Sequence, residues 1–457
     1  MGGISGRRTA LFSGALLLGV LSGMPVLLPG AAMAQEIEGS HSALGLSMGI
    51  EAGRNLDLES DNEARESRLN TALSYRLSRQ TARASLDLGS NLRWYLEDGG
   101  EDVFLPRLNG AYRLEGARSR LTLGLGYTRT EVTDQSVSYD DTGTLTSYDG
   151  TGLRSVLNGS AGFEGGIDAP LGYSLGYRHT DVSYDGTRSG SFSASTRDFY
   201  DLGLRLTPDA LGEVRLDLHH DRYRVDNSTR TERLTSRITL SGTRRLDAIT
   251  RLSLGVGYSE IDTTRTTIDS ARQGMGFSLG VVRDDPLGHS SASLSRALTA
   301  SGQRDELVIG RVRTLKTGRL EGLVGLSRSD RGSLDWIASL DWVSERPRDT
   351  LRVGLTRRIS SDNDNNDVVV TRVNGTLSHK FGEASSLRLA LQASLQDNET
   401  GASRQRASAS LSYLRQLTRE TRLDLGLRKE YSRNTSDRTA NSEVVFVTLE
   451  RDLDFLH

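Results

Sequence analysis

The stretch LTLGLGYTRT, Leu121 to Thr130, contains the pattern that decides the fold. In its first seven residues every second position is leucine or tyrosine, and the positions between them hold threonine or glycine. The pattern returns as LSLGVGY at Leu252–Tyr258 and, less strictly, as LDLGLRKEY at Leu423–Tyr431. A period of two is that of a β-strand, whose successive side chains point to opposite faces. The stretch therefore predicts a strand with one apolar face that ends in tyrosine.

Other segments keep this period but carry full charges on the second face. Examples are RASLDLGSNLRW (residues 83–94), EVRLDLHHD (213–221) and SLDWIASLDW (333–342). In each, leucine or tryptophan alternates with aspartate, arginine, serine or histidine for most of its length. The period stays at two from Ser42 to the end of the chain, which predicts an all-β protein.

Composition excludes several classes of protein. The chain has 457 residues and no cysteine, so a disulfide-stabilised scaffold is excluded. Its formal net charge is −2, which does not indicate a nucleic-acid partner. The mean hydropathy is −0.42 with 49 glycines, which argues against long or membrane-spanning helices in the mature chain.

The N-terminus has the layout of a secretory signal peptide. Arg7 precedes an apolar run, Ala10–Leu28, and Ala32–Ala34 has the small-x-small form of a cleavage site. The alternative is an uncleaved membrane anchor, but proline and glycine interrupt the apolar run. We expect residues 1–34 to be a cleaved signal peptide and residues 35–457 to form one transmembrane β-barrel.

The connections between the predicted strands alternate between tight and long. The tight ones are RLEGARSRL around Gly116, DAPLG at 168–172, TPDALG at 207–212, DDPLG at 284–288, KTGRL at 316–320 and SERPRD at 344–349. The longer or more polar ones include residues 55–66, 135–152, 361–368 and 432–443. This alternation is typical of an up-and-down meander whose two ends face different compartments. We expect about 22 strands, with a range of roughly 18 to 24.

A soluble secreted β-protein would also alternate, with its leucines in a core. That many strands would need a very large core, and no break in the sequence separates two sandwich domains. A closed barrel in a membrane pairs every backbone polar group internally and uses the same pattern inside out. Leucine then faces lipid, and charge, serine and glycine face water.

These features resemble the Gram-negative outer-membrane β-barrels of the porin-like type, including polysaccharide-export barrels. The resemblance covers Ser42–His457 and includes the terminal strand VVFVTLERDLDFLH, although Phe455 is followed by two further residues. It implies a single closed antiparallel barrel in the outer membrane. It also implies contact with membrane lipid, lipopolysaccharide and the outer-membrane assembly machinery. The first strand begins shortly after the cleavage site, so we expect no plug domain.

Two sets of residues follow from the alternation. Charged residues on the inward face are candidates for lining the lumen: Asp87, Arg93, Arg215, Asp217, Asp335, Asp341, Asp424 and Arg428. Aromatic residues on the outward face are candidates for girdles at the membrane interfaces: Trp94, Tyr127, Tyr177, Tyr258, Trp336, Trp342 and Tyr431. Charged rings in a lumen set selectivity in some pores, and in others they only solvate and cross-link the wall.

The chain offers no arrangement typical of catalysis. Its histidines form no zinc-binding motif, and no nucleophile elbow is present. The loop SDNDNNDV, with Asp362, Asp364 and Asp367, has oxygen ligands that could hold calcium, but it lacks the rest of a calcium-loop pattern and favours a solvated loop. We expect no enzyme activity, no cofactor and no metal.

Two functions therefore stay open. The first is a porin-like diffusion channel, or an export conduit with periplasmic export partners, that acts through a polar lumen of mixed charge. The second is a structural or interaction barrel with a blocked lumen and functional extracellular loops.

Overall fold

All the regular secondary structure of the described chain is β-strand. The structure, a computed structural model, describes residues 40–456 except 57, 59–62, 81–83, 98–102, 133–136, 140–144, 148–151, 187–191, 229, 267–268, 331–333, 362–365, 399–402 and 434–437. At 40, 80, 90–97, 103, 137–139, 145–147 and 456 it describes the backbone alone. The predicted signal peptide and its cleavage site lie outside these residues. No helix able to cross a membrane occurs in the described part.

The strands follow one another along the whole unit Glu38–His457. They are β1 (Ser40–Arg54), β2 (Arg65–Gln80), β3 (Ala84–Glu97), β4 (Val103–Glu115), β5 (Ser119–Val132), β6 (Val137–Tyr139), β7 (Leu145–Ser147), β8 (Gly152–Gly165), β9 (Leu171–Asp185), β10 (Ser195–Asp209), β11 (Gly212–Val225), β12 (Thr231–Arg245), β13 (Thr250–Thr264), β14 (Ser270–Asp285), β15 (Gly288–Thr299), β16 (Gly302–Leu315), β17 (Gly318–Ser329), β18 (Leu334–Glu345), β19 (Asp349–Ser361), β20 (Asp367–Lys380), β21 (Ser385–Asn398), β22 (Ser403–Gln416), β23 (Thr421–Arg433) and β24 (Thr439–Leu456).

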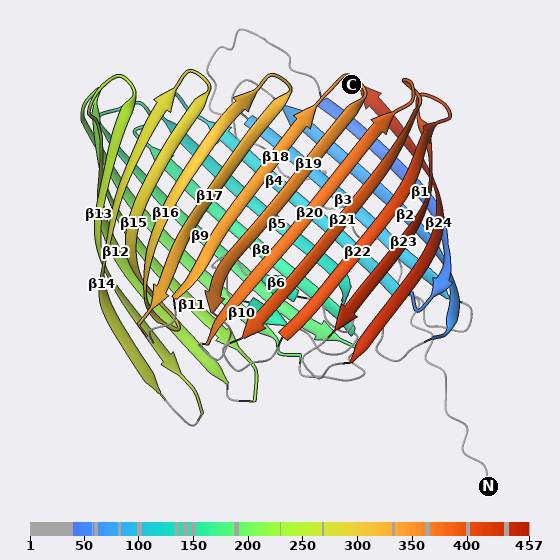
Figure 1. The fold of residues 1–457 in the computed structure, drawn as a ribbon, viewed down its shortest axis with the longest axis horizontal. Coiled ribbons are helices and arrows are strands. Elements are labelled where there is room, and N and C mark those ends of the chain that lie inside the picture. Colours follow the sequence, from blue (N-terminus) through green and yellow to red (C-terminus); the bar gives the residue numbers. More distant parts are fainter. Residues whose placement is uncertain are drawn as a thin grey trace, which may run out of the picture. The chain divides into compact units, whose positions relative to one another are not determined.

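Twenty-two of these strands form one closed antiparallel sheet. Each strand pairs with its neighbour in the sequence, except that β5 pairs with β8 across the loop that holds the small β6–β7 hairpin. The first and last strands close the ring, in a register that runs from His41↔Leu456 to Arg54↔Glu443. Figure 1 shows the resulting barrel of oblique strands. The prediction of a closed 22-stranded antiparallel barrel is confirmed.

The two ends of the barrel differ in their connections. All six predicted tight connections lie at one end, which also holds the start of β1 and the end of β24, and the longer loops lie at the other. We call them the short-turn end and the long-loop end. Three of the short turns share one device, in which an aspartate accepts a hydrogen bond from the backbone N–H two residues on: Asp209 from Leu211, Asp247 from Ile249 and Asp285 from Leu287. The bond from Ile249 holds the pKa of the Asp247 carboxyl below its usual range.

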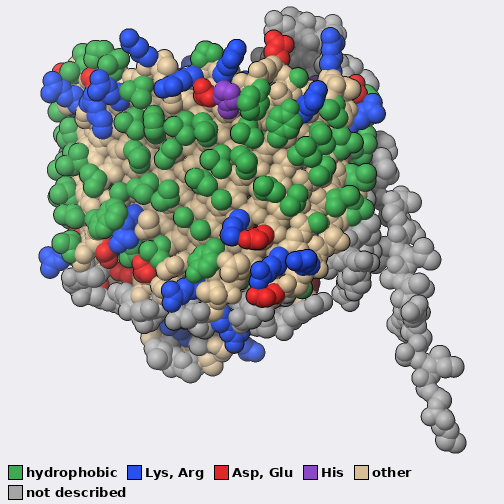
Figure 2. Space-filling model, turned by 45° about the vertical axis from the view of Figure 1, so that its right-hand side comes forward, with side chains coloured by type: hydrophobic (Ala, Val, Ile, Leu, Met, Phe, Trp, Pro, Cys, Tyr) green, Lys and Arg blue, Asp and Glu red, His purple; other side chains and the backbone are tan. Residues whose placement is uncertain are grey.

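The leucines of the opening stretch lie on the outside of the wall. Leu125 and Leu123, in the middle of β5, are 54% and 44% exposed, and their cross-strand partners on β4 and β8 are tyrosine, alanine and glycine, which share their face. Figure 2 shows hydrophobic side chains over the middle of the wall and charged side chains gathered toward its two ends. Large apolar side chains exposed over so much of a surface are normal only where lipid covers them.

A charge placed on this outer face tests the orientation. Leu125→Arg sets a guanidinium at mid-height on the apolar band, and we expect it to lower the free energy of unfolding by about 2–4 kcal/mol. Thr122→Arg is the matched control, because Thr122 lies on the opposite face of the same strand and its side chain is exposed. The measurement is denaturant unfolding of the protein reconstituted in phospholipid vesicles. Equal losses in the two variants would contradict the assignment of the faces.

Candidate functional site

Arginines and carboxylates on the face opposite the leucines form ion pairs along the inner wall. The strand registers place seven of the predicted lumen residues on this face: Asp87, Arg215, Asp217, Asp335, Asp341, Asp424 and Arg428. Arg215 pairs with Asp217 at 2.8 Å, and Arg428 lies 3.7 Å from both Glu51 and Glu430. The side chain of Arg93 lies outside the described residues. Arg215 and Asp217 lie two residues apart on β11, whereas the contact of Arg428 with Glu51 joins β23 to β1, so ion pairs within and between strands make the inner wall polar.

Tyrosines on the outer face share one geometry near the long-loop end. The hydroxyls of Tyr127, Tyr177 and Tyr258 each donate to a polar side chain on the next strand, two positions nearer the long-loop end. The acceptors are Ser155 at 3.3 Å, Asp198 at 3.0 Å and Gln273 at 2.8 Å. Each ring thus lies on the apolar band while its hydroxyl marks where polar side chains begin.

The other predicted girdle residues are less uniform. Trp336 lies near the long-loop end of β18 and is 49% exposed, and Trp342 lies nearer the short-turn end and is 36% exposed. Tyr431 is half-buried on β23. The side chain of Trp94 lies outside the described residues. That these aromatics form membrane girdles stays a prediction.

One connection at the long-loop end departs from the rest. Only Ala300 and Ser301 separate β15 from β16. The residues from Ala297 to Gln303 carry no charge, whereas the described connections on either side contain arginine or aspartate. A short neutral turn is cheap to bury if its backbone groups find partners. Here Thr299 Oγ1 donates to Gly302 O at 2.7 Å, and Gly302 adopts a φ of +142°, a conformation that favours glycine.

This turn folds into the barrel instead of continuing the wall. Its tip, Ser301, is 3% exposed and hydrogen-bonds Ser361 on β19 at 3.1 Å. On its other side the carbonyl of Leu298 accepts a hydrogen bond from Arg237 on β12 at 3.4 Å. Strands β13 and β14 separate it from β12, and β17 and β18 separate it from β19. The segment Leu298–Gly302, which we call the inward turn, therefore crosses the interior as a chord.

A buried ion pair fixes the inward turn. Arg304, at the start of β16, pairs with Asp367 at the start of β20, and their side chains are 9% and 7% exposed. Arg304 also donates to the carbonyl of Ile359 at 3.3 Å. The expectation that residues 361–368 form a solvated loop is wrong for Asp367, because this ion pair holds it in the interior. Asp362 and Asp364 lie outside the described residues, and no group of metal ligands occurs among the described ones.

The inward fold opens two seams in the wall near the long-loop end. Pairing between β14 and β15 stops at Phe277↔Arg296, and pairing between β18 and β19 stops at Ala338↔Arg357. The side chain of Gln303 fills the first seam and packs against Gly274. The contact is close, because a Cβ at position 274 would lie only 2.6 Å from the Gln303 amide nitrogen.

Arg357 fills the second seam. Its guanidinium lies 4.6 Å from the Trp336 ring and contacts the carbonyl of Trp336 at 3.2 Å and Asp335 at 3.4 Å. Asp335 thus contacts the arginine that closes this seam. The alternation of the sequence alone does not reveal this contact.

A cavity of about 660 Å³ lies between the inward turn and the wall strands β10–β13. Its charged lining residues are Arg197, Arg233, Arg237, Arg304, Arg358, Asp217 and Asp221. Arg197 forms a two-pronged pair with Asp221, at 2.7 and 2.5 Å, and Asp221 is 4% exposed. Phe199, His219 and Tyr223 complete the wall on this side. Of the residues predicted for the lumen, only Asp217 lines this cavity.

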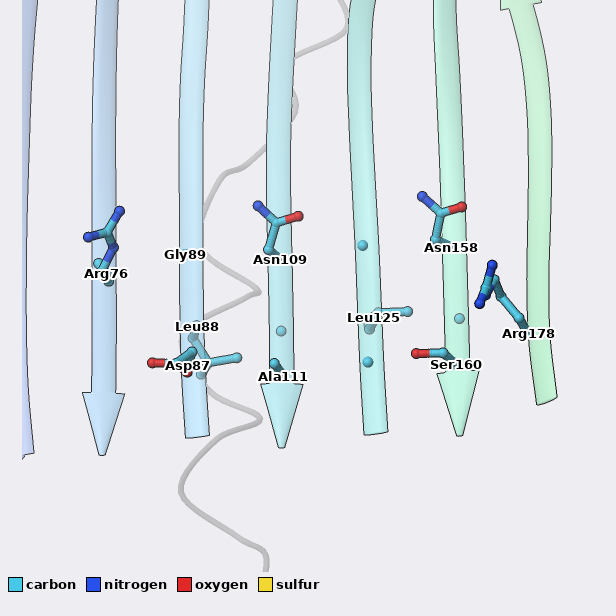
Figure 3. A pocket seen from close by; sticks show the side chains of 14 residues that line it. Arg76, Asp87, Leu88, Gly89, Asn109, Ala111, Leu125, Asn158, Ser160 and Arg178 are labelled. Atoms are coloured by element: carbon cyan, nitrogen blue, oxygen red, sulfur yellow. The ribbon is translucent and has the colours of Figure 1, made fainter. Parts of the chain in front are cut away.

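A second hollow of about 760 Å³ lies over the inner face of β2–β9. Figure 3 shows Arg76 and Arg178 at its two sides, with Asn109 and Asn158 between them. Its floor consists of small residues, and Asp87 is the predicted lumen residue that borders it. This hollow lies away from the inward turn, whereas the first cavity lies directly beside it.

Comparison with known proteins bears on the fold. No protein-family model matches the chain, and no curated protein matches it. Among solved structures, the barrel is similar to the ferric-catecholate import receptor Fiu from E. coli K12, with 11% identity, a TM-score of 0.63, and 90% of this chain and 81% of that chain covered. The siderophore receptor PirA from Acinetobacter baumannii is 7% identical, with a TM-score of 0.57 and coverage of 92% and 81%.

A third similar structure is the FrpB iron transporter from Neisseria meningitidis, with 8% identity, a TM-score of 0.59 and coverage of 90% and 82%. Likeness at this level of identity shows the fold alone. The prediction of an outer-membrane β-barrel is confirmed for the fold, and the same likeness supports the outer membrane as the location.

Removing the partner of Arg304 tests whether the buried pair fixes the inward turn. Asp367→Asn leaves a buried guanidinium without its counter-ion, and we expect the free energy of unfolding in vesicles to fall by about 3–5 kcal/mol. Glu321→Gln is the control, because the Arg319–Glu321 pair is 59% and 52% exposed. That change should cost no more than about 1 kcal/mol. A loss for Asp367→Asn as small as the control's would show that the pair does not hold the turn.

Proposed function

We propose that the protein is an outer-membrane transport barrel that conducts a polar solute through its lumen. The observation that carries this proposal is the charged inner face, which lines the barrel from the short-turn end to the cavity beside the inward turn. Water-filled barrels have such a polar interior and an apolar exterior. The similar structures are receptors and transporters, which favours transport over a purely structural role.

The proposal does not assign the ligands of the similar structures to this protein. Ferric-catecholate import is a property of Fiu, and an identity of 11% carries over no binding residue. The proposal includes two more specific points. The protein acts as a porin-type channel or an export conduit, and its lumen holds no plug domain. Barrels of about 22 strands usually hold a plug in their lumen. Here the inward turn and the side chains of the inner wall would narrow the passage instead.

The second candidate function is an interaction barrel with a blocked lumen. The inward turn favours it, because a chord across the interior obstructs the mouth near the long-loop end. The two functions differ in whether solute can pass around the turn. The hollow over β2–β9 leaves space away from the turn, and for that reason we favour conduction.

Conductance separates the two candidates. Refolded full-length protein, inserted into a planar lipid bilayer, should produce discrete current steps, since ions follow any continuous polar passage. The same preparation unfolded by heat is the control and should give none. A protein that is shown by electrophoresis to be folded, yet gives no steps, would exclude conduction and favour the interaction barrel.

A further inference from the structure

Arg237 is an arginine of the inner wall that lacks an acidic partner among the described residues. Its Nε donates to Ser259 Oγ at 3.0 Å, and its Nη2 donates to the carbonyl of Leu298 at 3.4 Å. No described residue accepts a hydrogen bond from its Nη1. The side chain is exposed toward the cavity beside the inward turn. A guanidinium has five N–H donors, so most of its capacity is open to a ligand.

Three neighbouring arginines differ from Arg237 because each of them pairs with a carboxylate. Arg197 is neutralised by Asp221, and Arg304 is neutralised by Asp367. Arg215, one strand away, is neutralised by Asp217. Hence Arg237 combines a full positive charge, exposure to the cavity and only neutral acceptors. A guanidinium with this charge and these free donors can bind an anion that enters the cavity.

The lining of the cavity is rich in arginine. It holds five arginines and two aspartates, and two of the arginines, Arg197 and Arg304, pair with carboxylates. A partly enclosed cavity strengthens the attraction between the guanidinium of Arg237 and an anion, because less water screens the charges.

The inward turn encloses this side of the cavity and also contributes to the site. Leu298 is 4% exposed and lines the cavity together with the buried Ile261 of β13. The hydrogen bond to Leu298 orients the guanidinium, so its free edge does not have to be ordered when a ligand arrives. Such preorganisation favours binding because it lowers the entropy lost on binding.

From these observations we infer that the cavity beside the inward turn binds an anionic solute through Arg237. The solute carries a carboxylate or a phosphate group, since both accept two parallel hydrogen bonds from a guanidinium. This inference rests on the proposed function, because it names the class of solute that the transport barrel takes. Neither the charge on the inner wall nor the likeness to other barrels requires it.

Binding to the folded full-length protein in detergent micelles tests the inference. The probes are glucose 6-phosphate, glucuronate and glucose, which share a ring and differ in charge. By isothermal titration calorimetry we expect at least one of the two anions to bind and glucose not to bind. Arg237→Gln should weaken anion binding at least tenfold, whereas Arg237→Lys, which keeps the charge, should weaken it less. Binding of one anion alone would identify which acidic group the site takes.

Arg428→Gln is the matched control, because Arg428 lies on the inner wall but contacts two glutamates. This variant should bind the anions as the natural protein does. The inference is overturned if neither anion binds, if glucose binds equally well, or if Arg237→Gln binds as tightly as the natural protein. Current steps without anion binding would reject this inference alone. Anion binding without current steps would reject conduction and leave the binding site in place.

Discussion

The closure of the sheet between β1 and β24 is the constraint on which the rest of the structure depends. Lipid offers no hydrogen-bond partner, so a sheet within a membrane must leave no edge. The pairing from His41↔Leu456 to Arg54↔Glu443 removes the last edge. Once the ring is closed, alternation along every strand sends one set of side chains to lipid and the other to the interior. Leucine on one face and charge on the other then follow from the same geometry.

At the two seams near the long-loop end, pairing between neighbouring wall strands stops short beside the inward turn. There the wall gives up backbone hydrogen bonds so that the inward turn can cross the interior. Side chains replace the missing bonds: Gln303 lies against Gly274, and Arg357 contacts Trp336 and Asp335. The local loss of pairing thus accompanies a partly enclosed cavity whose lining is rich in arginine.

Much of the fold could be predicted from the sequence because strand alternation and turn chemistry are local. The six tight connections, the number of strands and the outward leucines needed no knowledge of distant contacts. The inward turn could not be found in this way. Its partners Ser361 and Arg237 are remote in the sequence, and a turn buried by distant groups looks like any short hairpin. The one local indication is that residues 297–303 are uncharged where neighbouring loops are charged. Alternation placed Asp217 and Asp335 on the inner face, but it could not separate a residue that lines a cavity from one that seals a seam.

The orientation of the two faces can be measured directly along the opening stretch. The chain has no cysteine, so single cysteines can be placed at the non-glycine positions of Leu121–Thr130 and labelled with a fluorescent dye. With the protein in vesicles that contain brominated lipid, we expect quenching at the leucine and tyrosine positions and little at the threonine positions of the opposite face, Thr122, Thr128 and Thr130. A water-soluble quencher should give the opposite pattern. Quenching by lipid that does not alternate, or that favours the threonine positions, would contradict a barrel with its apolar face turned outward.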